Sequence, residues 1–199
     1  MKIVIVGASG TVGQAVTAEL SKRHDIVTAS RSAADVDIDL GDEASIEAGL
    51  KTAAPFDAVV SCAGSVVFKP LAEMTADDYA FGLMNKVLGQ INLIRHGIEH
   101  MNPGGSFTLT AGVLADDPIR LGSCASVANG AVESFVKAAA IELADGHRIN
   151  AVSATVLTSS YDTYFDYFPG VVPVDDDIVA RAYAKSVEGA QTGQVYPVV

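Results

Sequence analysis

Three glycines stand between a run of β-branched residues and the first helical pattern of the chain. The run "KIVIV" (2–6) is typical of a strand buried on both faces, and "TVGQAVTAELSKR" (11–23) carries apolar residues at helical spacing. Gly7, Gly10 and Gly13 lie in the turn that joins them. In such a turn the first glycine permits a tight bend, the second lets a phosphate approach the backbone, and the third lets the helix pack closely on the strand. The segment therefore predicts a dinucleotide-binding turn.

The rest of the chain repeats this alternation of strand and helix signals. Further strands are predicted at 25–30, 35–40, 56–64, 104–112, 147–157 and 193–199, and helices at 43–51 after a capping Asp42, at 75–101, at 123–144 and from a capping Asp175. Strands that alternate with helices imply right-handed crossovers and a parallel sheet. We therefore predict a single doubly wound, Rossmann-type α/β domain over residues 1–199, with about seven parallel strands and helices on both faces.

Composition excludes several classes of partner. The formal net charge is −11 and the cationic residues are scattered, so neither nucleic acid nor an anionic membrane surface is an expected partner. No apolar run approaches the ~18 residues that span a bilayer, and the start of the chain does not resemble a signal peptide. Cys62 and Cys124 lack metal-ligand spacing, and His96 and His100 are expected at a solvated helix end. We expect a cytoplasmic protein with free thiols and no metal site.

The end of the second predicted strand bears on the choice of cofactor. An NAD-binding protein usually has an Asp or Glu there for the ribose 2′-hydroxyl, whereas this chain has Ala29, Ser30, Arg31 and Ser32. A guanidinium beside two hydroxyls suits a 2′-phosphate and favours NADP(H) over NAD(H). The alternative is that Arg31 is an ordinary solvent-exposed residue at a strand end.

Three further segments make the resemblance to a known family specific. The chain resembles a short-chain dehydrogenase/reductase over essentially its full length: "DIDLGD" (37–42) is similar to the segment that contacts adenine, "SCAG" (61–64) to the segment beneath the cofactor, and "RINAVSATV" (148–156) to a late strand of the family. Together the glycine turn and the resemblance imply that the cofactor-binding residues are Gly7, Ser9, Gly10, Thr11, Val12, Gly13, Arg31, Ser32, Asp39, Leu40, Cys62, Ala63 and Gly64.

The same resemblance implies that the usual catalytic residues are absent. The family uses an Asn, a Ser, a Tyr and a Lys. Matching "NGAVESFVKAAAIEL" to the family pattern places Asn129 at the Lys and Ala125 at the Tyr. Matching "TLTAG" places Ala111, or Gly112, at the Ser, and matching "KVLG" places Lys86 at the Asn. The chain thus resembles a divergent subgroup that keeps the glycine motif and lacks these four residues.

Two of these changes look like an exchange, since Lys86 and Asn129 hold each other's usual residue type. We expect Lys86 to reach the nicotinamide ribose, or a water beside Asn129; the alternative is a surface Lys86 and a chance exchange. Thr110 and Tyr161 are the remaining candidates for catalysis. Tyr161 lies in an aromatic loop at 158–170 that could close over a substrate, although an aromatic lid or a dimer contact is the simpler interpretation.

These residues leave two functions open. One is an NADP(H)-dependent oxidoreductase with a non-standard active site that acts on an unknown small carbonyl or alcohol. The other is a catalytically inactive NADP(H)-binding sensor or regulatory protein that signals through the loop at 158–173. The helices at 75–101 and 123–144 are apolar on more than one side and predict a homodimer or homotetramer.

Overall fold

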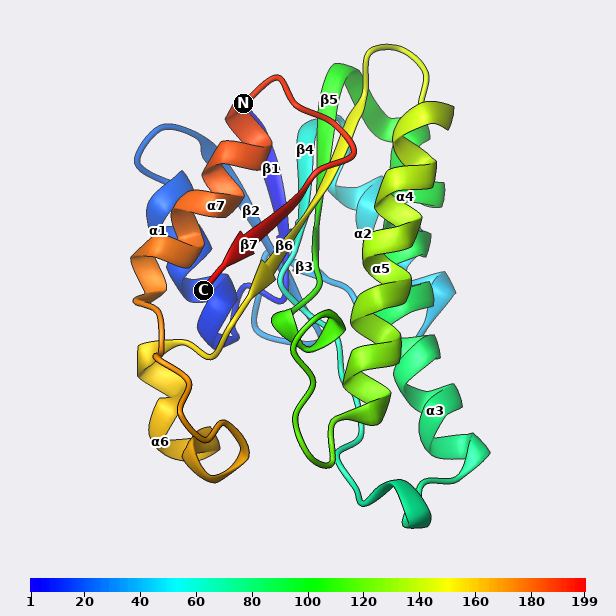
Figure 1. The fold of residues 1–199 in the computed structure, drawn as a ribbon. Helices are drawn as coiled ribbons and strands as arrows, with labels where there is room; N and C mark the ends of the chain where they lie inside the picture. The colour runs from blue at the N-terminus through cyan, green and yellow to red at the C-terminus, as the bar shows by residue number, and fades with distance from the viewer.

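A seven-stranded parallel sheet forms the centre of the computed structural model, which describes residues 1–199 (Figure 1). Its strands are β1 (Lys2–Val6), β2 (Asp25–Ser30), β3 (Val36–Asp37), β4 (Phe56–Ser61), β5 (Met101–Thr110), β6 (Arg148–Ala154) and β7 (Val195–Val198), in the order β3-β2-β1-β4-β5-β6-β7. The main helices are α1 (Thr11–Leu20), α2 (Glu43–Ala53), α3 (Ala76–Gly82), α4 (Gly89–Gly97), α5 (Ser123–Glu142), α6 (Tyr161–Tyr164) and α7 (Asp176–Glu188). The predicted Rossmann-type fold class is confirmed.

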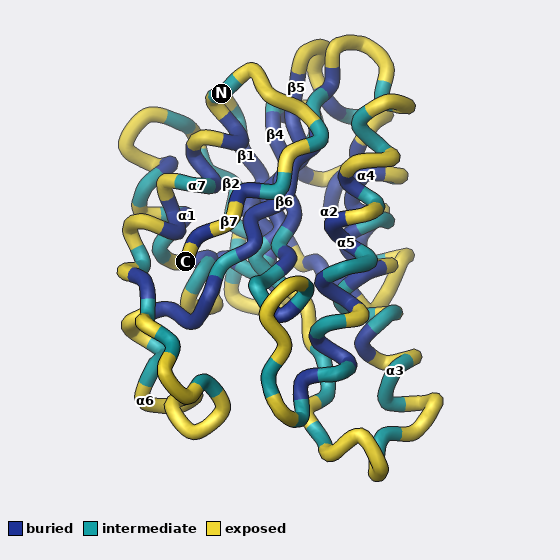
Figure 2. Tube along the Cα trace, viewed as in Figure 1, coloured by how far each residue is buried: buried dark blue, intermediate teal, exposed yellow.

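Helices cover both faces of the sheet, as the sequence predicts. α1 and α7 lie on one face, and α2, α4 and α5 lie on the other (Figure 1). Each face has its own apolar core, of 17 buried residues beneath α1 and α7 and 23 beneath α2, α4 and α5. Figure 2 shows the buried strands between these layers and the exposed segment around α6. None of the helices is both long and apolar enough to cross a membrane.

Local predictions were partly wrong at the ends of elements. The strand predicted at 35–40 is paired only at Val36–Asp37, and the strand predicted to reach 64 ends at Ser61. Asp42 caps α2 by accepting a hydrogen bond from the backbone N–H of Ala44 at 3.0 Å. Asp175 occupies the N-cap position of α7 without capping it, and its carboxylate accepts a hydrogen bond from the Thr158 hydroxyl at 2.9 Å.

The helix predicted at 75–101 is interrupted by a π-helical turn at Leu83–Leu88. A π turn holds one more residue than an α turn, so it rotates the following helix relative to the α-helical pattern. The sequence predicts one apolar stripe through Leu83, Val87, Ile91 and Ile94, but the buried residues of α4 are Gly89, Gln90, Leu93, Ile94 and Gly97. Ile91 is only partly buried, and Gln90, three residues after Val87 and four before Ile94, faces the core.

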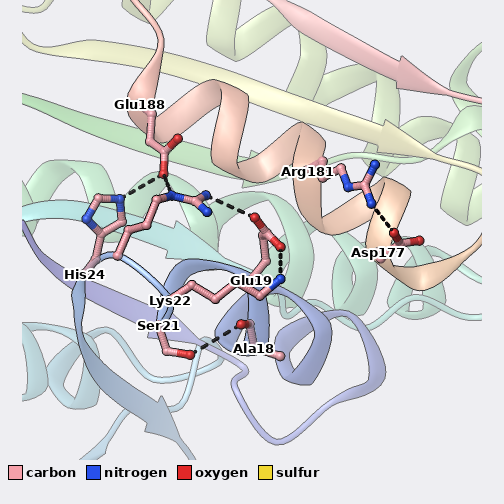
Figure 3. Close-up of polar contacts among 9 residues, drawn as sticks. Ala18, Glu19, Ser21, Lys22, His24, Asp177, Arg181 and Glu188 are labelled. Carbon is pink, nitrogen blue, oxygen red and sulfur yellow. Dashed lines mark hydrogen bonds and ion pairs between the residues drawn. The ribbon is translucent and has the colours of Figure 1, made fainter.

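Charged side chains join the C-terminal ends of α1 and α7 (Figure 3). Arg23 donates to Glu188 at 2.9 Å and to Glu19 at 3.0 Å, and His24 Nε2 lies 2.9 Å from the same Glu188 oxygen. These groups are solvent-exposed or partly exposed, and such ion pairs contribute little to stability. They lie where α1 ends, away from the glycine turn where it begins.

Candidate cofactor and active site

The strand order reverses direction between β1 and β4, and a cleft of about 320 Å³ opens at their carboxyl ends. Ligands bind at such a switch point in open parallel sheets, because the loops on its two sides diverge. The cleft is lined by the segments that follow four strands and by one residue of the π turn: Val6, Gly7, Ser9, Gly10, Ser30, Arg31, Ser32, Ile38, Asp39, Leu40, Cys62, Ala63, Gly64, Ser65 and Asn85. Most of the predicted cofactor residues therefore come together.

The glycine turn is narrow because it lacks side chains at the positions where they would collide with neighbouring atoms. Gly7 has φ +83°, and a Cβ there would lie 2.7 Å from the Cβ of Ala63. A Cβ at Gly13 would collide with the Gly7 carbonyl oxygen. Gly10 is the N-cap of α1 and provides no side-chain cap, so the N–H groups of the first helical turn, including Thr11 and Val12, have no capping partner. A narrow turn facing an uncapped helix N-terminus fits the pyrophosphate of a dinucleotide.

The end of β2 presents a cation to the same cleft. Arg31 and Ser32 are exposed and line the cleft, and no carboxylate pairs with the Arg31 guanidinium. The Ser30 hydroxyl donates to the Ser32 carbonyl at 2.5 Å, so this hydroxyl is already used. Asp39 is the only carboxylate that lines the cleft, and it accepts the backbone N–H of Gly41 at 2.9 Å. The charge at the end of β2 is therefore positive.

Lys86 enters the interior beside this cleft. It lies on the π turn, and its Nζ donates to the Ala111 carbonyl oxygen at 3.1 Å, directly after β5. Its side chain packs against Gly64, where a Cβ would lie 2.8 Å from the Lys86 Cγ. Burial lowers the pKa of Lys86 to about 8, because the charged ammonium loses water. The residue is partly buried, and its amine lies at the carboxyl edge of β4 and β5.

Asn129 approaches the same strand end from α5. The residue is 3% exposed, and its Oδ1 has no hydrogen-bond partner. Its Nδ2 would lie 2.9 Å from a Cβ at Gly112. Lys86 thus bonds Ala111 and Asn129 lies against Gly112, which are consecutive residues after β5. Ala125 lies one helical turn before Asn129 and is also buried. We call this arrangement the Lys86 corner.

The two other catalytic candidates have hydroxyls that are already engaged. Thr110 Oγ1 lies 2.6 Å from the Tyr183 hydroxyl and donates to the Ser61 carbonyl. Tyr183 belongs to α7, so the Thr110 side chain points to the face opposite Asn129. The Tyr161 hydroxyl donates to the Val171 carbonyl at 3.4 Å, and its ring packs edge-on against Phe165. Thr110 is therefore directed away from the Lys86 corner, and Tyr161 is bonded within its own loop.

A hollow of about 900 Å³ lies between the loop after β5 and the segment after α6. It is lined mainly by apolar and aromatic side chains together with Asp117, Arg120 and Asp166: the other residues are Pro70, Leu71, Pro118, Ile119, Leu121, Tyr167, Pro169 and Val171. Both bordering segments follow the carboxyl ends of strands. The hollow therefore lies beyond the carboxyl ends of the strands, the side of the sheet on which the cofactor cleft opens.

Sequence reasoning missed two polar residues of the site. Asn85 lines the cofactor cleft next to Asp39, and Gln90 is fully buried behind Lys86. The signal for Asn85 is its position immediately before Lys86. The signal for Gln90 is its spacing: it lies three residues after Val87 and four before Ile94, on the face of the helix that carries the apolar stripe.

Comparison with known proteins identifies relatives across the whole chain. A family model described as enoyl-(acyl carrier protein) reductase matches residues 1–190. The crystal structure of the protein lin1944 from Listeria innocua is 47% identical, with a TM-score of 0.98 over all of both chains. A small-chain dehydrogenase solved in complex with NADPH is 23% identical, with a TM-score of 0.87 over 100% of this chain and 96% of that one, a likeness of fold.

Curated relatives are more distant. A hydroxynaphthalene reductase-like protein from Metarhizium acridum is 28% identical over 85% of this chain and 74% of its own length. Its counterpart from Metarhizium brunneum is 32% identical, over 59% of this chain and 45% of its own length. The chain thus matches less than half of the second relative.

Proposed function

Because the chain belongs to the short-chain dehydrogenase/reductase superfamily, we propose that it is an NADP(H)-dependent oxidoreductase with a non-standard active site. Its substrate would be a small carbonyl or alcohol. The observation that carries the proposal is the continuity of the site: a glycine-built cleft with a cation at one end adjoins a buried ammonium at the carboxyl edge of β5. When bound, NADP(H) supplies or accepts the hydride.

The preference for NADP(H) rests on Arg31. Its guanidinium lines the cleft without a carboxylate partner, and exposed Ser32 follows it. A 2′-phosphate would gain charge-assisted hydrogen bonds there, whereas a ribose 2′-hydroxyl would find no acidic acceptor at the end of β2. Arg31→Ala is expected to weaken NADPH binding about tenfold and NADH binding little, as a contact of roughly 1.4 kcal/mol would.

Lys86 and Asn129 would carry the chemistry that the family's Tyr and Lys perform. An ammonium at Lys86 Nζ favours negative charge on a substrate oxygen and on the ribose hydroxyls. Its pKa of about 8 makes both of its protonation states accessible near neutral pH, so Nζ can donate or accept a proton. Asn129 retains an unused acceptor, Oδ1, that suits a water or a substrate hydroxyl beside it.

The test combines cofactor titration with a substrate panel. NADPH and NADH are titrated into the protein by fluorescence, and carbonyls and alcohols are screened at the nicotinamide absorbance. We expect tighter binding of NADPH and slow turnover that Lys86→Met abolishes. Lys51→Met, a substitution of an exposed lysine of α2, is the matched control and should leave cofactor affinity and turnover unchanged. Tighter NADH binding, or full activity of Lys86→Met, would contradict the proposal.

A specific observation also favours the second candidate, an NADP(H)-binding regulatory protein. Ala125 leaves no phenol in the pocket, and neither Thr110 nor Tyr161 offers a free hydroxyl to the Lys86 corner. Protonation by a general acid contributes typically 10²–10⁴-fold, so its absence slows an enzyme without forbidding hydride transfer. Tight NADPH binding with no turnover on the panel would favour the regulatory function.

We also propose self-association through the helices at 75–101 and 123–144. Both carry large apolar side chains that are exposed in the single chain: Phe81, Met84 and Leu88 on the first, and Val127 and Ile141 on the second. A symmetric contact would cover them in a homodimer or homotetramer. Light scattering at micromolar concentration should therefore give at least a dimer, and a monomer would contradict this.

A further inference from the structure

Gln90 is fully buried in α4, and its side-chain amide is hydrogen-bonded at both ends. Nε2 donates to the Lys86 carbonyl at 2.9 Å and to the Thr110 carbonyl at 3.0 Å. Oε1 accepts the Thr110 backbone N–H at 2.8 Å. Both amide hydrogens and the carbonyl are therefore used, and every partner is backbone.

These hydrogen bonds and that of Lys86 Nζ link Lys86, Gln90 and the end of β5 into one closed network. The Lys86 backbone carbonyl is joined through Gln90 to Thr110, and its Nζ donates to the carbonyl of the next residue, Ala111, at 3.1 Å. The backbone of Lys86, through Gln90, and its Nζ, directly, are thus both hydrogen-bonded to the end of β5. A lysine side chain has large rotamer freedom and a strongly hydrated charge, so it tends to swing into water unless its surroundings hold it.

An amide at this position is costly if its only task is to fill the core. Burying a polar group is unfavourable unless it is fully hydrogen-bonded, and even then an apolar side chain of the same shape can serve as well. Leu93, Ile94 and Gly97, the neighbours of Gln90 on the buried face, are all apolar or glycine. What the amide does that leucine or methionine cannot is to bond the Lys86 carbonyl and the end of β5 at once.

We propose that Gln90 is a positioning residue that holds the Lys86 ammonium in the site, an inference that rests on the proposed role of Lys86. Gln90 does not touch the substrate or the cofactor. Gln90 sets the distance between the π turn and the end of β5. It thereby determines where the Lys86 Nζ lies and how far Nζ is exposed to water.

The titration of Lys86 reports this placement. No carboxylate pairs with Lys86, and the depression of its pKa to about 8 is due to burial. From the adjoining loop after β4 the residue in contact with Lys86 is Gly64, which has no titratable group; β5 offers backbone carbonyls, and α5 offers the neutral amide of Asn129. A lysine released into water would return toward its ordinary pKa of 10.5.

The test uses the whole protein without cofactor. Gln90→Met keeps the length and apolar volume of the side chain and removes all three hydrogen bonds. Ser186→Ala is the matched control: Ser186 is equally buried and bonds Thr108 at 2.6 Å, but it lies on α7, across the sheet. The Lys86 midpoint is followed by NMR of labelled lysine, with the signal assigned by its absence in Lys86→Met, and NADPH affinity is measured in parallel.

We expect both variants to lose stability, and only Gln90→Met to raise the Lys86 midpoint, by more than one pH unit, and to weaken NADPH binding by roughly tenfold. An unchanged midpoint in folded Gln90→Met would overturn the proposal and leave the role of Lys86 intact. Conversely, wild-type binding and turnover by Lys86→Met would refute the proposed function, while the midpoint would still decide the placement. If Gln90→Met does not fold, Gln90→Leu replaces it, and failure of both to fold would assign Gln90 to core stability alone and end the proposal.

Discussion

The glycine turn and the Lys86 corner lie at the same edge of the sheet but are built of different parts. The turn consists of backbone, with Gly7 and Gly13 removing the side chains that would block it. The corner consists of side chains: Lys86, Gln90 and Asn129 converge on the backbone that follows β5. A site like the turn depends on the absence of side chains at a few positions of one short segment. A site like the corner depends on partners that come from three separate elements.

This difference bears on how each region can change. The turn tolerates no added atom at Gly7 or Gly13, because a Cβ at either position would collide with a neighbouring backbone atom or Cβ. If Lys86 and Asn129 act as we propose, the corner should accept an exchange of residue types between its helices, provided that one charge and one amide remain. A glycine-to-alanine substitution should therefore lower stability in the turn, at Gly13, and raise it slightly beside the corner, at Gly130.

The largest effect is expected for Gly13→Ala. The new Cβ would collide with the Gly7 carbonyl, so either α1 moves away from the sheet or the turn opens. Overpacking of this kind typically costs about 1–3 kcal/mol. We expect a lower midpoint of thermal unfolding and loss of measurable NADPH binding by fluorescence titration. A variant that binds NADPH as the wild type does would show that the turn is not the phosphate site.

The second effect tests whether Lys86 and Asn129 share one site. Asn129→Lys would place a second ammonium there, and Lys86→Asn would leave none, so each single variant should weaken NADPH binding. The double exchange, Lys86→Asn with Asn129→Lys, should recover much of the affinity. Residues in one network show coupling energies of about 0.5–3 kcal/mol in a double-mutant cycle. Losses that simply add in the double variant would place the two residues in independent sites.

The third effect is a pH dependence of stability that the corner has and the turn lacks. The pKa of Lys86 is lowered from 10.5 in the unfolded chain to about 8 in the fold. Between these values the unfolded chain binds more protons, so the free energy of unfolding rises with pH; below pH 8 the cost of the buried charge is fully present. Lys86→Met removes this cost.

Urea unfolding of the wild type and of Lys86→Met from pH 7 to 10 measures this effect. The advantage of the variant should be of order 2 kcal/mol near pH 7 and should shrink steadily above pH 8, whereas other titrating groups cancel between the two proteins. Lys51→Met is again the control. Parallel curves for Lys86→Met and the wild type would mean that Lys86 is hydrated in the fold.

The same contrast explains what the sequence predicts and what it does not. The alternation of elements, the sheet and the glycine turn follow from local periodicity and from glycine spacing, and all are found. The π turn at Leu83–Leu88 does not follow, and neither do the backbone partners that Gln90 finds at the end of β5. The engagement of Thr110 also does not follow, since its partner Tyr183 is 73 residues away in the chain. Contacts between side chains that are far apart in the chain produce no pattern in the spacing of residues along the sequence.

The smallest effect is expected for Gly130→Ala, the counterpart in α5 of the substitution at Gly13. Gly130 adjoins Asn129, but nothing lies within 4 Å of a Cβ built there. Alanine in a helix interior is favoured over glycine by about 0.5–1 kcal/mol, so this variant should unfold at a slightly higher temperature and bind NADPH unchanged. Thermal unfolding and NADPH titration measure both quantities. If self-association covers this part of α5, light scattering of Gly130→Ala would show a weakened oligomer, while its affinity for NADPH would stay unchanged. A loss of NADPH affinity in a fully assembled Gly130→Ala protein would instead mean that the Lys86 corner depends on the α5 backbone as strictly as the glycine turn depends on its own.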